Sequence, residues 1–419
     1  MRPSGEGPAI GADARTTLRA NRDFKVVVAG QALSALGDAI SITAMPLLIL
    51  SLTGSGALMG LVGALQVAPD LIVGVAAGAL ADRWDRRRMM FLADLGRAVL
   101  TFLIPLSFWL GLPVISVIII VAVPANLLRV VSDAAYTSSI PKLVGRDNLA
   151  RANSYMEATL SIPFIVSPAL AGILVSRIGG AATIAIDAVS FGLSAASLLM
   201  VRRSLRADRT GPTPRLLVDI REGITFVWRT MVLRLTIAYW SVMTIASAAL
   251  LPALAFYLTV DRGLGPQVFG LLGSAWSVGY LCGSLLAGRL GGTRLGLRMA
   301  ACGVVTGAAL LVVTRTRLPR TYLSAAFVLG GALAIQLVAY MTLRASATPD
   351  ELLGRVGSTS RTISVGLRPL GLLAGGALMD ATTGGTALMG MAAVSVGAST
   401  LFALIPKFRD AGAADTPAA

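Results

Sequence analysis

Acidic side chains that interrupt long apolar stretches are the residues of this chain best placed for chemistry. Asp38, Asp70, Asp94 and Glu157 each lie within such a stretch, and Asp187 is a further acid of this kind. A charge at the centre of a bilayer costs about 2.5–3.5 kcal/mol on insertion scales, and removal from water favours the protonated form of a carboxyl. Such a carboxyl can therefore take up and release a proton when its access to water changes.

Asp38 is the first candidate for proton coupling, because the sequence places no basic residue within a helical turn of it. The alternative for each acid is a structural ion pair with an arginine on another helix, such as Arg129 or Arg368. Within one helix, Asp94 lies three residues from Arg97, and Arg129 lies four residues from Asp133, so these pairs could neutralise each other.

The apolar stretches predict twelve membrane-spanning helices. The 419-residue chain is 55% hydrophobic and 14% charged, with a mean hydropathy of +0.77, whereas a soluble domain carries about 25% charged residues. A membrane helix needs about 20 mostly apolar residues. Runs of about this length lie near 24–51, 57–80, 89–110, 113–136, 153–176, 180–201, 233–259, 266–288, 298–314, 321–343, 361–380 and 384–405. We therefore expect an all-α integral membrane protein built from two six-helix bundles.

A polar stretch between the sixth and seventh runs divides the chain. We expect a tail over 1–22, a bundle over 23–201, a linker over 202–232, a second bundle over 233–406 and a tail over 407–419. The linker contains LLVDIREGITFVW, whose apolar residues have helical spacing. This pattern predicts an amphipathic helix that lies along the membrane interface and tethers the bundles.

The basic residues predict the orientation of the chain. Net charge is +15, and 33 of the 36 basic residues are arginine. If both termini are cytoplasmic, the cytoplasmic segments hold 28 basic residues and the outer loops hold five. Because basic residues favour the cytoplasmic side, we expect a multi-pass protein of the plasma membrane with both termini inside. The arginines lie in gaps between apolar runs and not on one helical face, which argues against nucleic-acid binding.

Several kinds of site are excluded by composition. The chain has no histidine, and its only cysteines, Cys282 and Cys302, lie inside apolar runs. A metal site built from His and Cys clusters is therefore excluded. We expect no cofactor and no enzyme activity, because a nucleophile–base pair is lacking as well.

The two bundles resemble each other in sequence. AGAL at 77–80 recurs as AGRL at 287–290, and MPLLIL at 45–50 has its partner in LPALAF at 251–256. Parallel repeats of this kind are a transporter architecture, with the substrate site between the halves. Aromatic side chains with a few polar groups suit a bulky amphipathic molecule. The candidates on the expected central helices are Gln31, Thr43, Asn126, Arg129, Trp240, Tyr257, Gln336 and Tyr340.

The stretch GALADRWDRR at 78–87 resembles the loop between the second and third spans of the major facilitator superfamily, with Asp85 in place of its second glycine. The resemblance implies a latch that joins the halves on the cytoplasmic side when the protein faces outward. In this latch Asp82 would meet the start of the eleventh span, and Arg86 could pair with an acid of the fourth. Alternatively, the arginines only enforce topology. The expected latch residues are Gly78, Asp82, Arg83, Arg86, Arg87 and Asp133.

SIPFIVSPALAGIL at 161–174 resembles the fifth-span motif of drug–proton antiporters, with Pro168 and Gly172 kept and Ser167 in place of a glycine. The alternative is an ordinary packing face of small residues. The segments 141–154, 185–195 and 349–358 resemble the exporter branch that contains the bacterial enterobactin exporter and the macrolide-efflux proteins.

The resemblance and the acids within the apolar runs together predict a secondary active transporter that works by alternating access. We expect proton-coupled efflux of an amphipathic small molecule, such as an antibiotic, a siderophore or another secondary metabolite. The partners would be this substrate, protons and the lipid bilayer, with the chain acting as a monomer. An importer or uniporter of the same fold is the alternative, and a membrane sensor or enzyme is a remote one.

Overall fold

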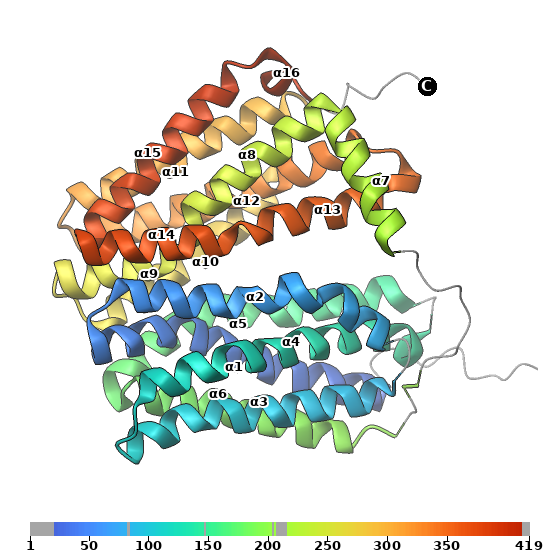
Figure 1. Cartoon of the computed structure of the whole chain (residues 1–419), viewed down its shortest axis with the longest axis vertical. Coiled ribbons are helices and arrows are strands. Elements are labelled where there is room, and N and C mark those ends of the chain that lie inside the picture. Colours follow the sequence, from blue (N-terminus) through green and yellow to red (C-terminus); the bar gives the residue numbers. More distant parts are fainter. Residues whose placement is uncertain (1–20, 82–83, 146–147, 203–204, 207–215, 413–419) are drawn as a thin grey trace, which may run out of the picture.

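The computed structural model describes the backbone of residues 21–81, 84–145, 148–202, 205–206 and 216–412. Side chains are described for these residues except 71–81, 150, 158, 160 and 216–220. The tails expected at both ends therefore lie mostly outside the described residues. All regular elements in the described part of the chain are helices, arranged in two stacked groups (Figure 1).

The first half consists of six long helices. They are α1 (Arg22–Thr53), α2 (Gly56–Ala81), α3 (Arg86–Trp109), α4 (Val114–Val144), α5 (Leu149–Ile178) and α6 (Gly180–Leu199). Each covers one of the first six predicted spans. The helices α4 and α5 extend beyond the apolar runs, because polar residues at a membrane surface can continue a helix in water.

The second half is more interrupted. It contains α7 (Leu216–Arg229), α8 (Met231–Ala248), α9 (Leu250–Phe256), the π-helix η2 (Tyr257–Asp261), α10 (Pro266–Ala287), α11 (Leu295–Arg315), α12 (Pro319–Ser346), the 3-10 helix η3 (Asp350–Leu352), α13 (Leu353–Gly366), α14 (Arg368–Ala381), α15 (Gly384–Ala403) and α16 (Pro406–Arg409). The seventh span is built from α8, α9 and η2, and the eleventh from η3, α13 and α14.

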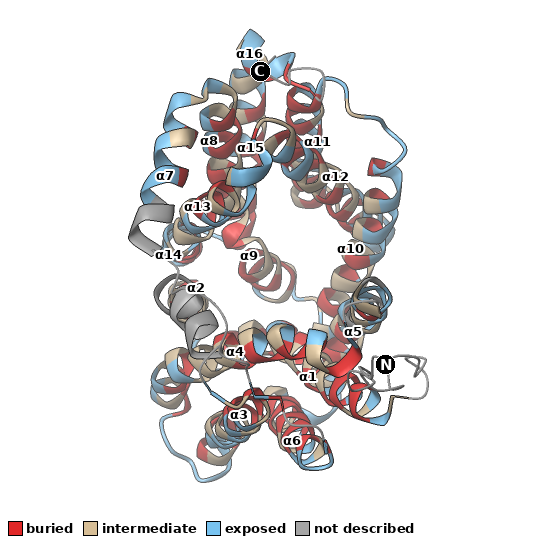
Figure 2. Ribbon diagram, turned by 90° about the vertical axis from the view of Figure 1, so that its right-hand side faces the viewer, coloured by how far each residue is buried: buried red, intermediate tan, exposed pale blue. Residues whose placement is uncertain are grey.

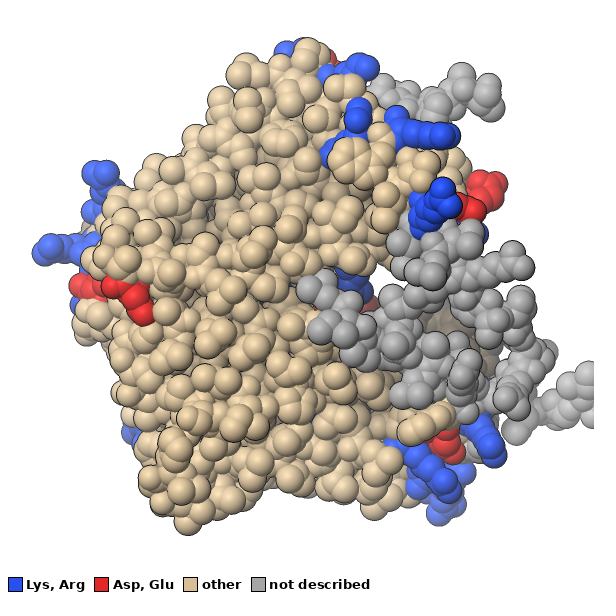
Figure 3. Space-filling model, in the orientation of Figure 1, with Lys and Arg blue, Asp and Glu red and all other residues tan. Residues whose placement is uncertain are grey.

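The prediction of a twelve-span membrane fold is confirmed. Eleven spans in the described residues are long and apolar enough to cross a membrane, and α2, a helix of 26 residues, covers the remaining run. Apolar side chains face outward on these helices; Ile120, for example, is 71% exposed. Figure 3 shows that Lys, Arg, Asp and Glu gather at the left and right ends of the molecule. Between them lies a broad surface free of charge, apart from a few charged atoms in a hollow between the halves.

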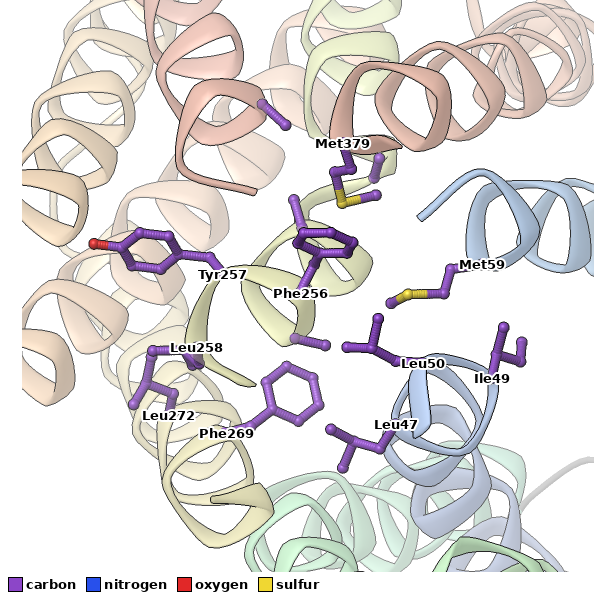
Figure 4. Close-up of a cluster of buried hydrophobic side chains, with 14 of the residues drawn as sticks. Leu47, Ile49, Leu50, Met59, Phe256, Tyr257, Leu258, Phe269, Leu272 and Met379 are labelled. Atoms are coloured by element: carbon purple, nitrogen blue, oxygen red, sulfur yellow. The ribbon is translucent and has the colours of Figure 1, made fainter. Parts of the chain in front are cut away.

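An apolar cluster joins the halves at one end of the molecule, which we call the sealed end. This end carries the loops around 54–55, 262–265 and 382–383. The cluster brings together Leu47 and Leu50 of α1, Met59 of α2, Phe256 of α9 and Phe269 of α10 (Figure 4). Because these buried side chains leave no polar path between the halves there, the cluster excludes water from the interior on that side.

Small residues let the halves approach closely on the same side. A Cβ added at Gly60 of α2 would lie 2.3 Å from the carbonyl oxygen of Leu372 in α14. A Cβ at Gly270 of α10 would lie 2.3 Å from the carbonyl oxygen of Pro168 in α5. Backbone contact of this kind is typical of helix pairs in membranes. Accordingly, α2 and α5 are the helices of the first half that lie beside the second (Figure 2).

The opposite end carries the linker, and we call it the linker end. The amphipathic stretch forms α7, which packs against α13 of the second half. Val227 is buried with Val356, Arg355 donates to the Glu222 carboxylate, and a Cβ at Gly223 would lie 2.6 Å from the Thr359 hydroxyl. The helix therefore belongs structurally to the second half and is not suspended between the two.

Candidate functional site

A cavity of about 390 Å³ lies among the helices of the first half. Its apolar wall includes Ile42 and Met45 of α1, Phe164 of α5 and Phe191 of α6. Every helix from α1 to α6 contributes to the lining. The polar and charged lining residues are Asp38, Ser41, Gln66, Arg97, Thr101, Asn126, Arg129, Asp133 and Asp187. The combination of a hydrophobic wall with charges of both signs suits an amphipathic ligand.

Asp38 is paired with an arginine of another helix. Nη2 of Arg97 on α3 donates to Oδ1 of Asp38 at 2.5 Å, and the guanidinium carbon lies 3.8 Å from the centroid of the Phe191 ring. The Arg97 side chain is only 7% exposed, whereas that of Asp38 is 32% exposed. Arg97 is thus fixed from two sides, and Asp38 is the partner that faces the cavity.

This pair matches the alternative left open for Asp38, an ion pair with an arginine of another helix, although the arginine is Arg97 and not Arg129 or Arg368. It also differs from the possible pairing of Arg97 with Asp94 along α3. Asp94 is instead fully buried and accepts hydrogen bonds from the hydroxyls of Ser132 at 3.0 Å and Ser194 at 2.7 Å. Spacing along one helix could not reveal this arrangement, because the partners come from neighbouring helices.

A second charged group surrounds Arg129 of α4. Its guanidinium donates to Asp70 of α2 at 2.8 Å and to Asp133 at 3.2 Å. Its Nε also donates to Asn126 at 3.2 Å. The expected Arg129–Asp133 pair is therefore present. Asp70 is also paired with Arg129, which is the structural role considered for it as the alternative to proton coupling. Arg368, at the start of α14 in the second half, is close enough to Asp70 for their charges to interact.

Asp187 of α6 was noted in the sequence as an acid within an apolar run but was not among the proton-coupling candidates. It is only 3% exposed, yet it lines the cavity together with Asp38 and Arg97. The Ser190 hydroxyl lies 3.4 Å from its carboxylate, while the same hydroxyl donates to the Asp187 carbonyl at 2.7 Å. A usable sequence signal was present: Phe191, which stacks on Arg97, follows Asp187 by one helical turn.

The remaining proton-coupling candidate lies elsewhere. Glu157 is exposed on α5 and is not part of the cavity lining. Among the described residues, no group of three or more His, Cys, Asp or Glu side chains is arranged to hold a metal ion.

Only part of the expected latch lies within the described residues. Asp82 and Arg83 lie outside the described residues, and Gly78 is described only as part of the α2 backbone. Arg87 donates to the carbonyl oxygens of Leu198 and Leu199, both at 2.8 Å, and so binds the C-terminal end of α6 within its own half.

Asp85 and Asp133 also have other partners than the expected latch requires. Asp85, the residue that departs from the superfamily pattern, caps the N-terminus of α3 by accepting from the backbone N–H groups of Arg87 and Arg88. This is a common role for aspartate. Asp133, the expected partner of Arg86, is paired with Arg129.

The fifth-span motif forms the contact with α10. Pro168 has no N–H, so the carbonyl of Phe164 one turn earlier loses its helical partner. The Ser277 hydroxyl of α10 donates to that oxygen at 2.8 Å. The Ser274 hydroxyl donates to the carbonyl of Ile165 at 2.8 Å and accepts from the N–H of Ala169 at 3.2 Å. Two serines of the second half thus satisfy the opened turn of α5.

Gly172, the second residue kept in that motif, lies one turn further along α5. A Cβ at this position would lie 2.6 Å from the carbonyl oxygen of Pro266. The glycine therefore continues the close contact between α5 and α10 toward the sealed end.

The expected substrate-cavity residues divide into two groups. Asn126 and Arg129 line the cavity. The others are not among its lining residues: Gln31, Thr43, Trp240, Tyr257, Gln336 and Tyr340.

Five side chains of this second group, all except Gln31, make structural contacts. Gln336 is 1% exposed and donates to the Tyr239 hydroxyl at 2.7 Å and to the carbonyl of Met299 at 3.1 Å. Tyr257 is buried at the sealed end and donates to the carbonyl of Val313. Thr43 donates to a carbonyl of its own helix. In addition, Trp240 stacks on Tyr340 with 4.6 Å between ring centroids. A role of these residues in substrate binding stays a prediction.

Comparison with known proteins places this geometry in context. The sequence matches the family described as transmembrane secretion effector over residues 16–418. The multidrug efflux pump Tap of Mycobacterium tuberculosis is 28% identical over 399 residues, which cover 91% of this chain and 89% of that protein. Macrolide efflux protein A of Streptococcus pyogenes is 29% identical over 280 residues, which cover 64% of this chain and 66% of that protein.

Solved structures share the fold at lower identity. The nucleoside transporter NupG superposes with a TM-score of 0.74 at 11% identity, covering 92% of this chain and 99% of that chain. A bacterial homologue of the iron transporter ferroportin in an inward-facing state superposes with a TM-score of 0.72 at 18% identity, covering 94% of this chain and all of that one (100%).

Proposed function

The chain belongs to the transmembrane secretion effector family within the major facilitator superfamily, and we propose that it exports an amphipathic small molecule in exchange for protons. Membership makes it a multi-pass efflux transporter and not an enzyme. The substrate class, the coupling to protons and the orientation are the parts that we propose.

The observation that carries the proposal is the Asp38–Arg97 pair in the wall of the cavity. An ionisable pair inside a membrane protein is costly and usually functional. Asp38 is its more exposed member, so a proton or a cationic ligand that enters the cavity can reach it. The apolar wall offers a surface for the remainder of an amphipathic molecule. The names of the relatives, which refer to multiple drugs and to macrolides, are compatible with an amphipathic small-molecule substrate.

Alternating access supplies the transport step. The apolar cluster closes the sealed end. The distribution of basic residues favours an orientation in which the linker end is cytoplasmic. In this orientation the conformation faces inward, ready to take substrate from the cytoplasm or the inner leaflet. Rocking of the two halves about the cavity would then open the sealed end.

The test is transport in proteoliposomes with an imposed pH gradient, with radiolabelled erythromycin as the probe. Each pH unit is worth about 1.4 kcal/mol per proton, so the wild-type protein can concentrate substrate up to about tenfold per unit for each proton exchanged. We expect Asp38→Asn to abolish this accumulation, because the cavity loses the carboxylate that balances Arg97.

The matched control is Asp410→Asn. Asp410 lies outside the spans, and hydrogen bonds from Arg409 lower the pKa of its carboxyl, so it stays ionised at neutral pH. This variant should accumulate erythromycin like the wild type. Undiminished accumulation by Asp38→Asn would refute the role of Asp38. Gradient-independent counterflow by the wild type would indicate the uniporter alternative.

A further inference from the structure

Three carboxyl groups surround a single guanidinium in the first half. Arg97 interacts with the charges of Asp38, Asp187 and Asp94, which come from α1, α6 and α3. Asp94 and Asp187 are almost wholly buried, at 0% and 3% exposure. The third helix that packs on α6 is α5, and its residues 158–176 include no charged side chain. Asp133 of α4 also interacts with the charges of Arg97 and Asp38, but it is paired with Arg129. The uncompensated charge of the site therefore comes from the three acids around Arg97.

The balance of these charges requires a bound proton. With all three acids ionised, the group would carry two uncompensated negative charges, although two of the three carboxyls, Asp94 and Asp187, are almost wholly buried. Carboxyl groups that lie close together in a buried site cannot all be ionised at once, because their negative charges repel each other. Protonation of one carboxyl removes most of this penalty.

The hydrogen bonds indicate which carboxyl carries the proton. Asp94 accepts from two hydroxyls, and Asp38 accepts from Arg97, so both have the donors that an ionised carboxylate needs. Asp187 has weaker donors: the Ser190 hydroxyl lies 3.4 Å away and makes its shorter bond to a carbonyl. The Ser41 hydroxyl, which lines the same cavity, interacts with the Asp187 carboxyl but without normal hydrogen-bond geometry. Of the three acids, Asp187 is therefore the one whose negative charge is least stabilised by hydrogen bonds.

Packing keeps Asp187 within reach of the other two groups. A Cβ added at Gly37 of α1 would lie 2.4 Å from Oδ1 of Asp187, so the carboxyl occupies the space that a side chain would need there. The next residue on α1 is Asp38. Phe191, one turn beyond Asp187 on α6, supports the Arg97 guanidinium. A rotation of the Arg97 side chain, without any helix movement, would therefore change its acidic partner.

We propose that Asp187 holds the transported proton in this conformation, and that Arg97 moves from Asp38 to Asp187 when the proton leaves. The inference rests on the proposed exchange of substrate for protons. In the step, the O–H bond of the Asp187 carboxyl breaks and the proton passes to cavity water. Arg97 then donates to the new carboxylate, and its hydrogen bond to Asp38 opens. Asp38 is left ionised and exposed to the cavity, where it binds the cationic group of a basic amphipathic substrate.

The first experiment locates the proton by infrared spectroscopy. The purified full-length protein in liposomes is titrated with acid and base while the carbonyl stretch of protonated carboxyls is followed. The wild type should show a band from a buried carboxyl that disappears as the pH rises. The band should be absent from Asp187→Asn and present in Asp94→Asn. Persistence of the band in Asp187→Asn, or its loss in Asp94→Asn instead, would overturn the assignment.

A second measurement uses the wild type alone and so does not depend on the folding of any variant. Dicyclohexylcarbodiimide, an apolar reagent, adds to protonated carboxyls in apolar surroundings, and peptide mass spectrometry locates the adduct. We expect the adduct on Asp187, with a yield that falls as the pH rises and falls again when erythromycin is present. An adduct confined to Asp38 or Asp94 would contradict the inference.

Transport by the wild type separates this inference from the proposed function. With pyranine enclosed in the vesicles, erythromycin movement should be accompanied by proton movement in the opposite direction. If the wild type moves no protons, both proposals fail together. If it does move protons while the band and the adduct belong to another acid, only the role of Asp187 fails.

Discussion

At the scale of single residues, Arg97 combines a fixed position with a proposed exchange of partners. Stacking on Phe191 holds the guanidinium in place while it donates to Asp38, and we propose that Asp187 is its second partner. A lysine could not reproduce this, because an ammonium has neither the planar face for stacking nor the fork of donors. The site therefore depends on the shape of arginine as well as on its charge.

Gln336 provides a test of whether buried polar residues in the second half bind substrate. It joins α12 to the Tyr239 hydroxyl of α8 and to the backbone of α11. Replacement by leucine should reduce stability by about 0.6–1.7 kcal/mol, the range for hydrogen bonds between membrane helices. Thermal unfolding in detergent measures this loss. Erythromycin binding should be unchanged, and a large fall in affinity would return Gln336 to the substrate site.

The sequence identified acids within apolar helices but did not predict their partners. Arg97 is 59 positions from Asp38 in the chain and reaches it from another helix. Asp187 was noticed only as one charge among several. The partner of a side chain in a helical bundle depends on the rotation and tilt of neighbouring helices, and these follow from packing that spacing in one chain does not encode.

At the scale of helices, the opened turn at Pro168 makes α5 dependent on α10. Ser274→Ala combined with Ser277→Ala would leave the carbonyls of Ile165 and Phe164 without their partners. An unpaired buried polar group costs about 1–3 kcal/mol, so the sealed conformation should lose population to forms in which α5 and α10 have separated. Spin labels on the two helices, read by pulsed electron resonance, would show longer distances.

Ser284→Ala is the control for that pair of substitutions. Ser284 lies on the same helix but is exposed and donates to the carbonyl of Leu281 in its own helix. It should leave the distance distribution unchanged. An unaltered distribution in the double variant would mean that the serines contribute nothing to closure.

The motif around Pro168 predicted that another helix packs closely against α5, and α10 does so. Proline and glycine at these positions indicate a helix that has lost a hydrogen bond and can be approached closely. The identity of the approaching helix, and the use of serine hydroxyls to complete the turn, were not readable from α5 itself, because the donors lie more than a hundred residues further on. Likewise, the amphipathic pattern predicted α7 but not its attachment to α13.

At the scale of the whole molecule, the sealed end is closed by a polar contact as well as by the apolar cluster. Asp380, at the end of α14, accepts from the Ser55 hydroxyl at 2.7 Å and from the backbone N–H of Gly56 at 2.5 Å. It thereby caps the N-terminus of α2 in the other half, where the helix dipole favours a negative charge. The resemblance assigns the mirror-image contact, from the end of the second span to the start of the eleventh, to Asp82 at the linker end.

Asp380→Ala should therefore favour opening of the sealed end. A lost cap of this kind is worth about 0.5–2 kcal/mol, which changes the ratio of closed to open forms by roughly 2- to 30-fold. Accessibility of a cysteine introduced at Met59 to an impermeant thiol reagent measures the shift, in a background without Cys282 and Cys302. Asp350→Ala, an exposed acid at the linker end, serves as the comparison. Equal labelling in both variants would argue against a latch at Asp380.

The architecture of the molecule followed from hydropathy, repeat and motif, since twelve apolar runs in two matching sets allow few other arrangements. The conformation did not follow. In the proposed alternating-access cycle, the inward- and outward-facing states are built from the same helices. They differ in which ends of α2, α5, α10 and α14 are in contact. The small free-energy difference between the two states cannot be predicted from the apolar runs.

Leu205 is buried in the first half and Lys142 donates to the carbonyl of Arg206, so the chain is attached to that half up to residue 206. The helix α7, which begins at residue 216, is docked on α13 of the second half. The ten residue steps between these points span at most about 33 Å, and the contact faces of the halves, α2 with α14 and α5 with α10, lie elsewhere. The halves should therefore find each other through their faces alone, and the polypeptide cut within 207–215 and produced as two pieces should still assemble.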